Sequence, residues 1–160
     1  MRRAAETDVA SILRVLRSNQ DDKSLFQQPE HQVRKTLADF FVTTGEDGAV
    51  TGCAALHWHS RGNAEILAVA VSPELQGQGV GSRLMGECIS RALRTNSDVQ
   101  LWLATAKPQY FARFGFHPVS RFRLPAGVLW TKFRLVFQQP TGRWIPAIAG
   151  RHTFMVHRRG

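Results

Sequence analysis

The sequence predicts one α/β domain over residues 1–160, with a central sheet flanked by helices. Three observations support this fold class. The run Ala64–Val71 is almost wholly apolar, as expected for a central strand that is buried on both faces. Apolar residues then recur with helical spacing between Leu84 and Leu93. The chain has 160 residues, which is enough for a single domain with a substantial core.

Two helices are expected before this strand. The first follows Thr7 or Asp8 as its N-cap, and its apolar side is formed by Val9, Ile12, Leu13 and Leu16. The second begins at Pro29, because proline suits the first helical turn, and continues through "PEHQVRKTLADFF". Its apolar side would comprise Val33, Leu37, Phe40 and Phe41.

A hairpin and further strands complete the expected sheet. Gly45-Glu46-Asp47-Gly48 separates two β-rich runs, which predicts a hairpin. Ser72-Pro73 ends the central strand, because proline cannot donate to the sheet ladder. Later in the chain we expect a strand at Val99–Thr105, a short helix ended by Gly115, and a strand in "FHPVSRF".

Residues 124–160 form a less typical C-terminal segment. We expect a helix over Ala126–Gln139 and a last strand near Thr153–Arg158. One side of that helix carries three aromatic residues, which favours a helix that packs on the core and leaves a mobile lid as the alternative. These residues are Trp130, Phe133 and Phe137.

Composition narrows the class of protein. With 43% hydrophobic and 21% charged residues, the chain is typical of a folded globular protein. The sequence has no apolar run of the ~20 residues that a membrane span requires, and its N-terminus lacks the apolar stretch of a signal peptide. We therefore expect a cytoplasmic protein without a membrane partner.

Net charge and cysteine spacing indicate which partners and metals to expect. The chain has 21 Lys and Arg against 12 Asp and Glu, a formal net charge of +9, which attracts anionic partners. No recognised nucleic-acid motif accompanies this charge, so we expect no nucleic-acid partner. Cys53 and Cys88 have no metal-binding or redox spacing. We expect both to be buried free thiols and expect no metal site.

A glycine-rich loop joins the central strand to the following helix. Gly77, Gly79 and Gly81 alternate there, and glycine lets a backbone turn tightly and approach a ligand closely. Unpaired N–H groups at a helix start bind anions. The loop is neither a Walker loop, because Gly81 is followed by Ser82-Arg83, nor a Rossmann loop, whose glycine spacing differs. A plain glycine-rich turn is the alternative to a phosphate site.

Two stretches, "LAVAVSPELQGQGVGSRLM" and "YFARFGFHPV", resemble the GNAT superfamily of N-acetyltransferases. The acyl-CoA signature of that superfamily, Gln/Arg-x-x-Gly-x-Gly/Ala, reads Gln76–Gly81 here. The second stretch, Tyr110–Val119, looks like the late helix-to-strand segment that commonly ends in Gly-Phe. The resemblance covers about residues 1–123 and is closest in appearance to amino-acid N-acetyltransferases of the N-acetylglutamate synthase type.

This resemblance implies a GNAT-type fold, in which a mixed, mostly antiparallel sheet has a parallel, splayed strand pair at the acyl-CoA site. It also implies acetyl-CoA as cosubstrate, with no metal. The backbone of Val69, Ala70 and Val71 would run beside the pantetheine arm. The pyrophosphate would be held by the N–H groups of Gly77, Gln78, Gly79, Val80, Gly81 and Ser82.

The implied reaction is direct attack of a primary amine on the thioester, without a protein nucleophile. By family position, the Val69 N–H is the expected oxyanion donor and Glu65 the expected base, acting through water. A solvated glutamate at a strand end is the alternative for Glu65. His57 and His59 are expected to share a strand face, because alternate residues of a strand point to the same side. They could form a proton relay, a wall of the acceptor site or an ordinary polar pair.

The acid that protonates the departing thiolate is less clear from the sequence. Superfamily members commonly have a tyrosine where Phe111 stands, and the tyrosine of this chain is one residue earlier, at Tyr110. Because a helix turns about 100° per residue, Tyr110 need not face the same site. Either Tyr110 is displaced into the role, or the thiolate leaves without a side-chain acid, which we favour.

The expected acceptor is a small-molecule amine, with an amino acid such as glutamate as the first candidate. If the C-terminal helix is a lid, its basic side chains would bind an acceptor carboxylate in paired hydrogen bonds. Those residues are Lys132 and Arg134, with Arg121 or Arg123. The alternative function is that of an acyl-CoA-binding sensor without catalysis. A homodimer also remains open as the assembly.

Overall fold

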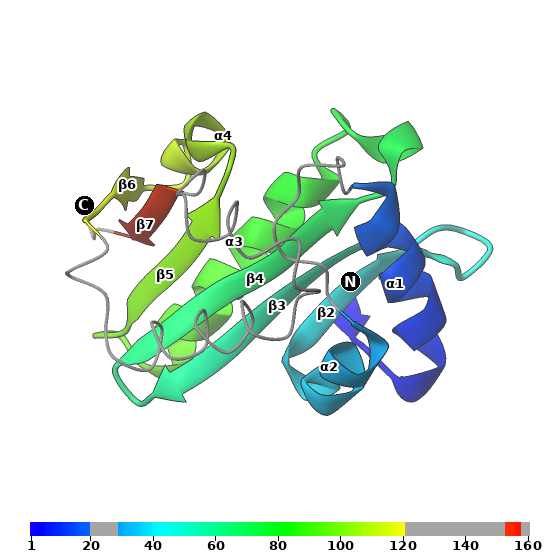
Figure 1. Ribbon diagram of the computed structural model, residues 1–160, viewed down its shortest axis with the longest axis horizontal. Helices are drawn as coiled ribbons and strands as arrows, with labels where there is room; N and C mark the ends of the chain where they lie inside the picture. The colour runs from blue at the N-terminus through cyan, green and yellow to red at the C-terminus, as the bar shows by residue number, and fades with distance from the viewer. Residues whose placement is uncertain (20–28, 121–152, 158–160) are drawn as a thin grey trace, which may run out of the picture.

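The computed structural model describes residues 1–19, 29–120 and 153–157, and the strands among them form one sheet (Figure 1). These strands are β1 (Arg2–Arg3), β2 (Phe40–Thr44), β3 (Val50–Ser60), β4 (Asn63–Val71), β5 (Gln100–Thr105), β6 (Phe116–Pro118) and β7 (Thr153–His157). Their order in space is β1-β2-β3-β4-β5-β7-β6. The pair β4–β5 is parallel and the other neighbours are antiparallel, which confirms the mixed, mostly antiparallel sheet.

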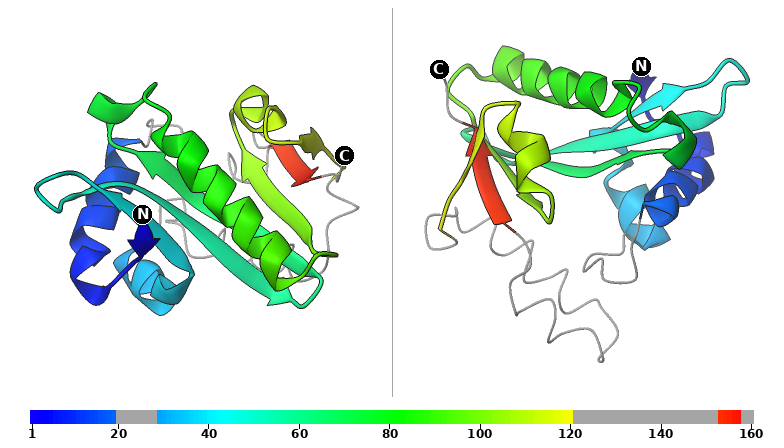
Figure 2. Two further views of the ribbon diagram at one scale, coloured as in Figure 1. Left: turned by 180° about the vertical axis from the view of Figure 1, so that it is seen from behind. Right: turned by 90° about the horizontal axis from the view of Figure 1, so that it is seen from above.

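Helices cover both faces of the sheet. The α-helices are α1 (Val9–Ser18), α2 (Glu30–Lys35), α3 (Val80–Thr95) and α4 (Pro108–Ala112), and the short 3-10 turns are η1 (Glu6–Asp8), η2 (Leu37–Asp39) and η3 (Pro73–Leu75). Figure 2 shows α3 on one face, with α1 and α2 on the opposite face. The expected helix over Ala126–Gln139 lies outside the described residues, whereas the last strand is confirmed as β7.

Each face of the sheet buries its own apolar cluster, because successive residues of a strand point to opposite sides. On the α3 face the cluster includes Leu56, Ile66, Leu84, Met85 and Phe116. On the α1 face it includes Val9, Ile12, Val33, Val42 and Cys53. The sheet is therefore the middle of three layers, and strands β2, β3 and β4 contribute residues to both clusters.

The prediction that the second helix extends to Phe41 was wrong. Helix α2 ends at Lys35, and Phe40 and Phe41 begin strand β2. Phe40 packs into the cluster under α1, whereas Phe41 packs into the cluster under α3. A strand buries two consecutive aromatic rings on opposite faces, while a surface helix has one apolar side for both. Burial in two layers therefore overrides the helical spacing.

Strands β4 and β5 pair over a short length and then separate. Their parallel ladder contains three residue pairs, from Asn63↔Gln100 to Glu65↔Trp102. Strand β4 continues from there to Val71 while paired with β3 on its other side. The splayed parallel pair expected from the family resemblance is thus present, with the later half of β4 at the divergence.

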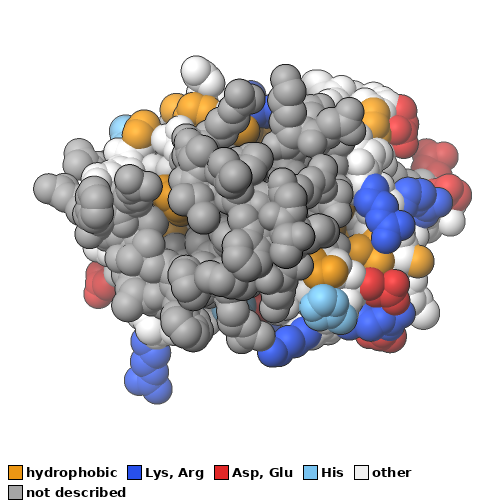
Figure 3. All heavy atoms as spheres, in the orientation of Figure 1, with side chains coloured by type: hydrophobic (Ala, Val, Ile, Leu, Met, Phe, Trp, Pro, Cys, Tyr) orange, Lys and Arg blue, Asp and Glu red, His pale blue; other side chains and the backbone are white. Residues whose placement is uncertain are grey.

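Acidic and basic side chains lie interleaved on the surface formed by α1 and α2. Figure 3 shows blue and red side chains side by side on the right of the molecule. Among them, Arg34 pairs with both Glu6 and Glu30. Part of the positive charge of the chain is therefore locally neutralised on this surface, where exposed ion pairs contribute little to stability.

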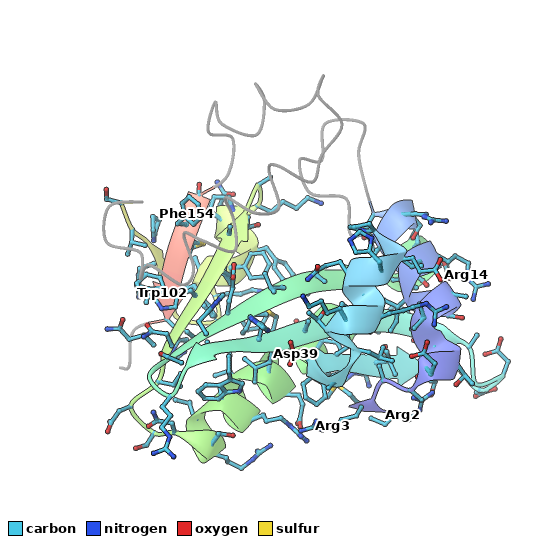
Figure 4. The ribbon with its side chains drawn as sticks, turned by 60° about the horizontal axis from the view of Figure 1, so that its bottom comes forward. Arg2, Arg3, Arg14, Asp39, Trp102 and Phe154 are labelled. Atoms are coloured by element: carbon cyan, nitrogen blue, oxygen red, sulfur yellow. The ribbon has the colours of Figure 1, made fainter. Side chains whose placement is uncertain are left out.

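Asp8 occupies the N-cap position of α1, as the sequence had suggested. Its side chain, however, anchors the N-terminal strand instead of bonding to the helix. Its carboxylate accepts hydrogen bonds from Arg2 at 2.6 and 2.9 Å and from the backbone N–H of Ala5 at 2.7 Å. The side chain makes no capping bond to the helix. Figure 4 shows Arg2 and Arg3 on β1, beside the helical layer. The hydrogen bond from Arg2 lowers the pKa of Asp8 below its ordinary value.

Replacing Asp8 tests this anchor. A group whose pKa is lowered by folding contributes stability above its ordinary pKa, and that contribution is lost as the pH falls through the lowered pKa. We expect Asp8→Asn to reduce the free energy of unfolding at pH 7 by about 1 kcal/mol. The difference should close in strong acid, where the wild-type carboxylate is protonated. Urea unfolding across pH measures it, with the exposed Glu46→Gln as control, and a difference that does not vary with pH would contradict the mechanism.

Candidate functional site

Strand β4 contains a bulge just beyond its pairing with β5. Cys53 of β3 faces Ala70 and Ala55 faces Leu67, so one β3 residue stands opposite two residues of β4, Ala68 and Val69. Ala68 has a φ of +52°, which is unusual for a residue with a Cβ. A bulge takes backbone groups out of the ladder. The Val69 N–H, expected to be the oxyanion donor, therefore belongs to the irregular part of the strand.

The side chain of Cys53 forms a hydrogen bond with the backbone of this bulge. Its thiol donates to the carbonyl oxygen of Ala68 across 3.5 Å, and the residue is fully buried. Burial raises the pKa of the Cys53 thiol to about 12, and that of Cys88 likewise to about 12. Thiols with such pKa values do not form the reactive thiolate near neutral pH. Both cysteines are buried and free, as predicted.

The three glycines of the loop after β4 have different structural reasons. Gly77 and Gly79 have φ values of +80° and +79°, which glycine adopts without steric cost, and Gly79 is the N-cap of α3. Gly81 lies in the first turn of α3, where a Cβ would stand 2.5 Å from the hydroxyl of Tyr110. A turn accounts for the first two glycines, and only close packing accounts for the third.

The loop delivers a set of backbone donors at the start of α3. The first bond into the helix runs from the Arg83 N–H to the Gly79 carbonyl at 3.0 Å. The preceding N–H groups, those of Val80, Gly81 and Ser82, have no intrahelical acceptor. The Gln78 N–H instead donates to Leu75 within the loop, at 3.4 Å. Of the predicted pyrophosphate donors, the three at the helix start are the best placed for an anion.

Gln76, the signature glutamine, fixes the loop from behind. Its amide nitrogen donates to the side-chain oxygen of Asn19 at 2.9 Å and to the carbonyl of Val71 at 3.3 Å. Asn19 donates to the same Val71 carbonyl at 2.8 Å and to Val15 at 2.8 Å. This amide clasp (Gln76, Asn19 and the Val71 carbonyl) ties the loop to the ends of β4 and α1. The Val71 carbonyl thus accepts hydrogen bonds from both amide side chains.

Tyr110 and Arg113 lie over the start of α3. The Arg113 guanidinium stands 4.2 Å from the centre of the Tyr110 ring and donates to the Ser82 hydroxyl at 3.1 Å. The Phe111 ring meets Tyr110 edge-on at 5.0 Å. Sequence reasoning missed Arg113, because an arginine that follows a short helix gives no signal until the fold brings the end of α4 beside α3. Tyr110 thus lies beside the first turn of α3, where the glycine loop ends.

A second polar group lies on the face of the sheet that α1 and α2 cover. Glu65 is fully buried, so the interpretation of a solvated strand-end glutamate was wrong. Its Oε2 lies 3.1 Å from Nε2 of His59, and the side chain of His59 is only 5% exposed. An ionised carboxylate is costly to bury unless it is paired and hydrogen-bonded. His59 supplies one such partner to Glu65.

His57 extends this group toward the surface. It stands directly across the ladder from Glu65, and its ring meets that of His59 edge-on, with centroids 4.9 Å apart. Its Nδ1 lies 2.7 Å from Oδ2 of Asp39, which Figure 4 shows beside the sheet. The hydrogen bond to Asp39 raises the pKa of His57, and the charges of Asp39 and Glu65 add to this rise against the effect of burial.

The predicted site residues of β4 and the loop lie in succession along the chain. Glu65, the Val69 bulge and the start of α3 follow one another along one strand and its connection. The proposed lid residues Lys132, Arg134, Arg121 and Arg123 lie outside the described residues. Within the described ranges, no cluster of three or more His, Cys, Asp or Glu side chains is arranged to hold a metal. Nor does a helix there have the length and apolarity to cross a membrane.

Comparisons with known proteins agree in pointing to one family. The model of the acetyltransferase (GNAT) family matches residues 7–116. The amino-acid acetyltransferase of Mycobacterium tuberculosis is 32% identical over 127 residues, covering 75% of this chain and 69% of that protein. The amino-acid acetyltransferase of Neisseria meningitidis serogroup A is 29% identical over 126 residues, covering 78% of this chain. The chain spans only 29% of the length of that second relative.

A solved structure shows the same fold. It is the N-acetylglutamate synthase from Neisseria gonorrhoeae, complexed with coenzyme A and N-acetyl-glutamate, with a TM-score of 0.79 and 24% sequence identity. The similarity covers 98% of this chain and 34% of that chain. The likeness confirms the fold class predicted from the sequence.

Substitutions at Ala68 test the bulge. Ala68→Gly should raise the free energy of unfolding by about 1 kcal/mol, because glycine adopts a positive φ without the steric cost of a Cβ. Ala68→Val should lower it, since a β-branched residue is disfavoured at this φ. Urea denaturation measures both. A valine variant as stable as the wild type would show that the strand does not need this backbone conformation.

Gly81 and Tyr110 should show strong coupling. Gly81→Ala places a methyl group against the Tyr110 hydroxyl, which Arg113 and Phe111 hold in place, so we expect weaker binding of CoA. Removing the hydroxyl leaves ring carbon Cζ at 3.6 Å, an ordinary contact, so Tyr110→Phe should restore binding in the double variant. Calorimetric titration of CoA into the four proteins measures the coupling. Additive effects of the two substitutions would refute it.

Proposed function

The chain belongs to the GNAT acetyltransferase family, and on that premise we propose that it transfers the acetyl group of acetyl-CoA to the amine of an amino acid. The observation that carries this proposal is the position of Glu65. Its fully buried carboxylate lies 3.1 Å from His59, on the strand that contains the bulge and leads into the glycine-rich loop. A module that only binds acyl-CoA has no need of that carboxylate, so the arrangement favours catalysis over sensing.

Acetyl-CoA would bind where β4 and β5 have separated. Its pantetheine arm would lie beside Val69 and Ala70, as an added strand at the divergence. The pyrophosphate would accept hydrogen bonds at the start of α3, where the helix dipole adds partial positive charge. Arg113 would contribute a full positive charge at the same end, next to Ser82. The remaining loop residues, Gly77, Gln78 and Gly79, would shape this turn around the diphosphate.

The transfer would proceed by direct attack. Glu65 would remove a proton from the incoming ammonium through water, giving the neutral amine that attacks the thioester carbonyl. The Val69 N–H would donate to the developing oxyanion, and a donor fixed by a bulge needs no reorganisation for that role. The thiolate of CoA would then leave. Tyr110 sits against the first turn of α3, and we propose that the thiolate departs without a side-chain acid.

An amino acid is the proposed acceptor because of the relatives. The matching proteins of Mycobacterium tuberculosis and Neisseria meningitidis are named amino-acid acetyltransferases, and the structural neighbour was solved with N-acetyl-glutamate. Glutamate is therefore the first acceptor to test. The buried carboxylate of Glu65 also suits a substrate that arrives as an ammonium ion.

The decisive experiment is amine-dependent release of the CoA thiol, with the product mass confirmed. The panel would contain L-glutamate, the other amino acids, a polyamine and short peptides. We expect turnover with one or a few amino acids, and none with any acceptor would overturn the proposed function.

Glu65→Gln tests the base within the same assay. It should lower kcat by about 10²–10⁴-fold, as loss of general-base catalysis does, and leave CoA affinity unchanged. Glu46→Gln, on the exposed hairpin, is the matched control and should behave as the wild type. Near-normal turnover of Glu65→Gln would exclude Glu65 as the base.

A further inference from the structure

The proposed reaction releases one proton per turnover near neutral pH. An amine R–NH₃⁺ and acetyl-CoA give R–NH–COCH₃, CoA–SH and H⁺. The N–C bond forms, the C–S bond breaks, and the amine nitrogen loses two protons. One proton ends on the thiolate, and the other must reach solvent. The base that collects the proton bound for solvent must pass it to water before the next cycle.

Glu65 has no exposed surface of its own through which to return a proton. Its side chain is 0% exposed and that of its neighbour His59 is 5% exposed. The next groups outward are far more accessible, with His57 at 33% and Asp39 at 27%. Four titratable groups thus run in series from the buried carboxylate to the surface, and exposure rises at the step from His59 to His57.

Each neighbouring pair in this series is in contact. Glu65 Oε2 and His59 Nε2 are 3.1 Å apart, and His57 Nδ1 and Asp39 Oδ2 are 2.7 Å apart. The two imidazole rings meet edge-on at 4.9 Å between centroids, so that a proton would pass between them by ring reorientation or through a water. Imidazole accepts and donates protons through separate nitrogens, which makes it suited to passing a proton on.

We propose that His59, His57 and Asp39 form the path by which the proton collected by Glu65 leaves for solvent. This inference rests on the proposed function. The three residues act through Glu65 and do not contact the reacting atoms, so they are positioning and proton-path residues rather than catalytic ones. Asp39 comes from η2, the histidines from β3 and the glutamate from β4.

The electrostatics of His57 fit a relay at the exit. The groups that face it are Asp39 from η2, His59 from β3 and Glu65 from β4. Its raised pKa, caused mainly by the hydrogen bond to Asp39, allows His57 to take up a proton at a higher pH than an isolated imidazole. The side chains of His57 and Asp39 are both partly exposed, so either group can pass the proton to water.

The test uses His57→Gln in the full chain, with proton exchange supplied from outside. We expect kcat to fall by roughly tenfold or more while the KM for acetyl-CoA stays unchanged. Raising the concentration of imidazole buffer at constant pH and ionic strength should restore kcat, because a small base replaces the missing relay. The matched control is His31→Gln, which removes an exposed histidine on α2.

A second variant tests the role of Asp39. Asp39→Asn removes the carboxylate that raises the pKa of His57, so the NMR titration of His57 and the pH dependence of kcat should both move to lower pH. The NMR arm does not depend on turnover. Joint movement of the two supports the path, whereas a shifted His57 titration with an unchanged pH–rate profile overturns it.

The outcomes separate this inference from the proposed function. An active wild type whose His57→Gln variant has normal kcat would overturn the path alone. A loss of kcat that imidazole does not restore would show a structural role for His57 and also overturn the path. A wild type inactive with every acceptor would overturn the function, and the path with it.

Discussion

The irregularity of β4 is the constraint on which the site depends. Over Asn63–Glu65 the strand has neighbours on both sides, and beyond that point only β3 accompanies it. The bulge at Ala68 and Val69 interrupts this ladder, which resumes at Ala70 and Val71 before the strand leads through η3 into the glycine loop. Regular pairing would satisfy every backbone group within the sheet. The end of the pairing with β5 leaves one edge of β4 without a neighbouring strand beyond Glu65, and the bulge takes Ala68 and Val69 out of the regular ladder on the other edge.

The two layers around the sheet give the two ends of the site different chemistry. Backbone donors, Tyr110 and Arg113 gather at the start of α3, where an anion is favoured. The carboxylates and imidazoles gather on the face toward α1 and α2, where an ammonium is favoured. A two-substrate reaction needs both environments close together without mixing them. Strand β4 satisfies that requirement, because the Glu65 side chain lies on its α1 face and the loop after the strand begins α3 on the opposite face.

Much of this was predictable from sequence, for physical reasons. The apolar run of β4, the helical spacing of α3 and the loop glycines are strong local signals. The helix predicted through Phe41 failed because consecutive aromatic residues satisfied two separate cores, which local spacing does not reveal. The bulge carries no signal either, since Ala68 is an ordinary strand residue with an uncommon φ. The burial of Glu65 and its link to Asp39 through the histidines depend on η2 reaching β3, a contact between distant parts of the chain.

The amide clasp behind the loop has a consequence for how the site responds to solution conditions. Gln76 and Asn19 hold the loop through neutral groups only, and neither side chain titrates in the physiological range. Dissolved salt screens charges and leaves such bonds largely intact. The contour of the loop should therefore persist from dilute buffer to high salt, while attraction of a polyanion to the helix start and Arg113 weakens. Neutral hydrogen bonds thus set the conformation of the loop, whereas charge sets its attraction for phosphate, so salt affects the two separately.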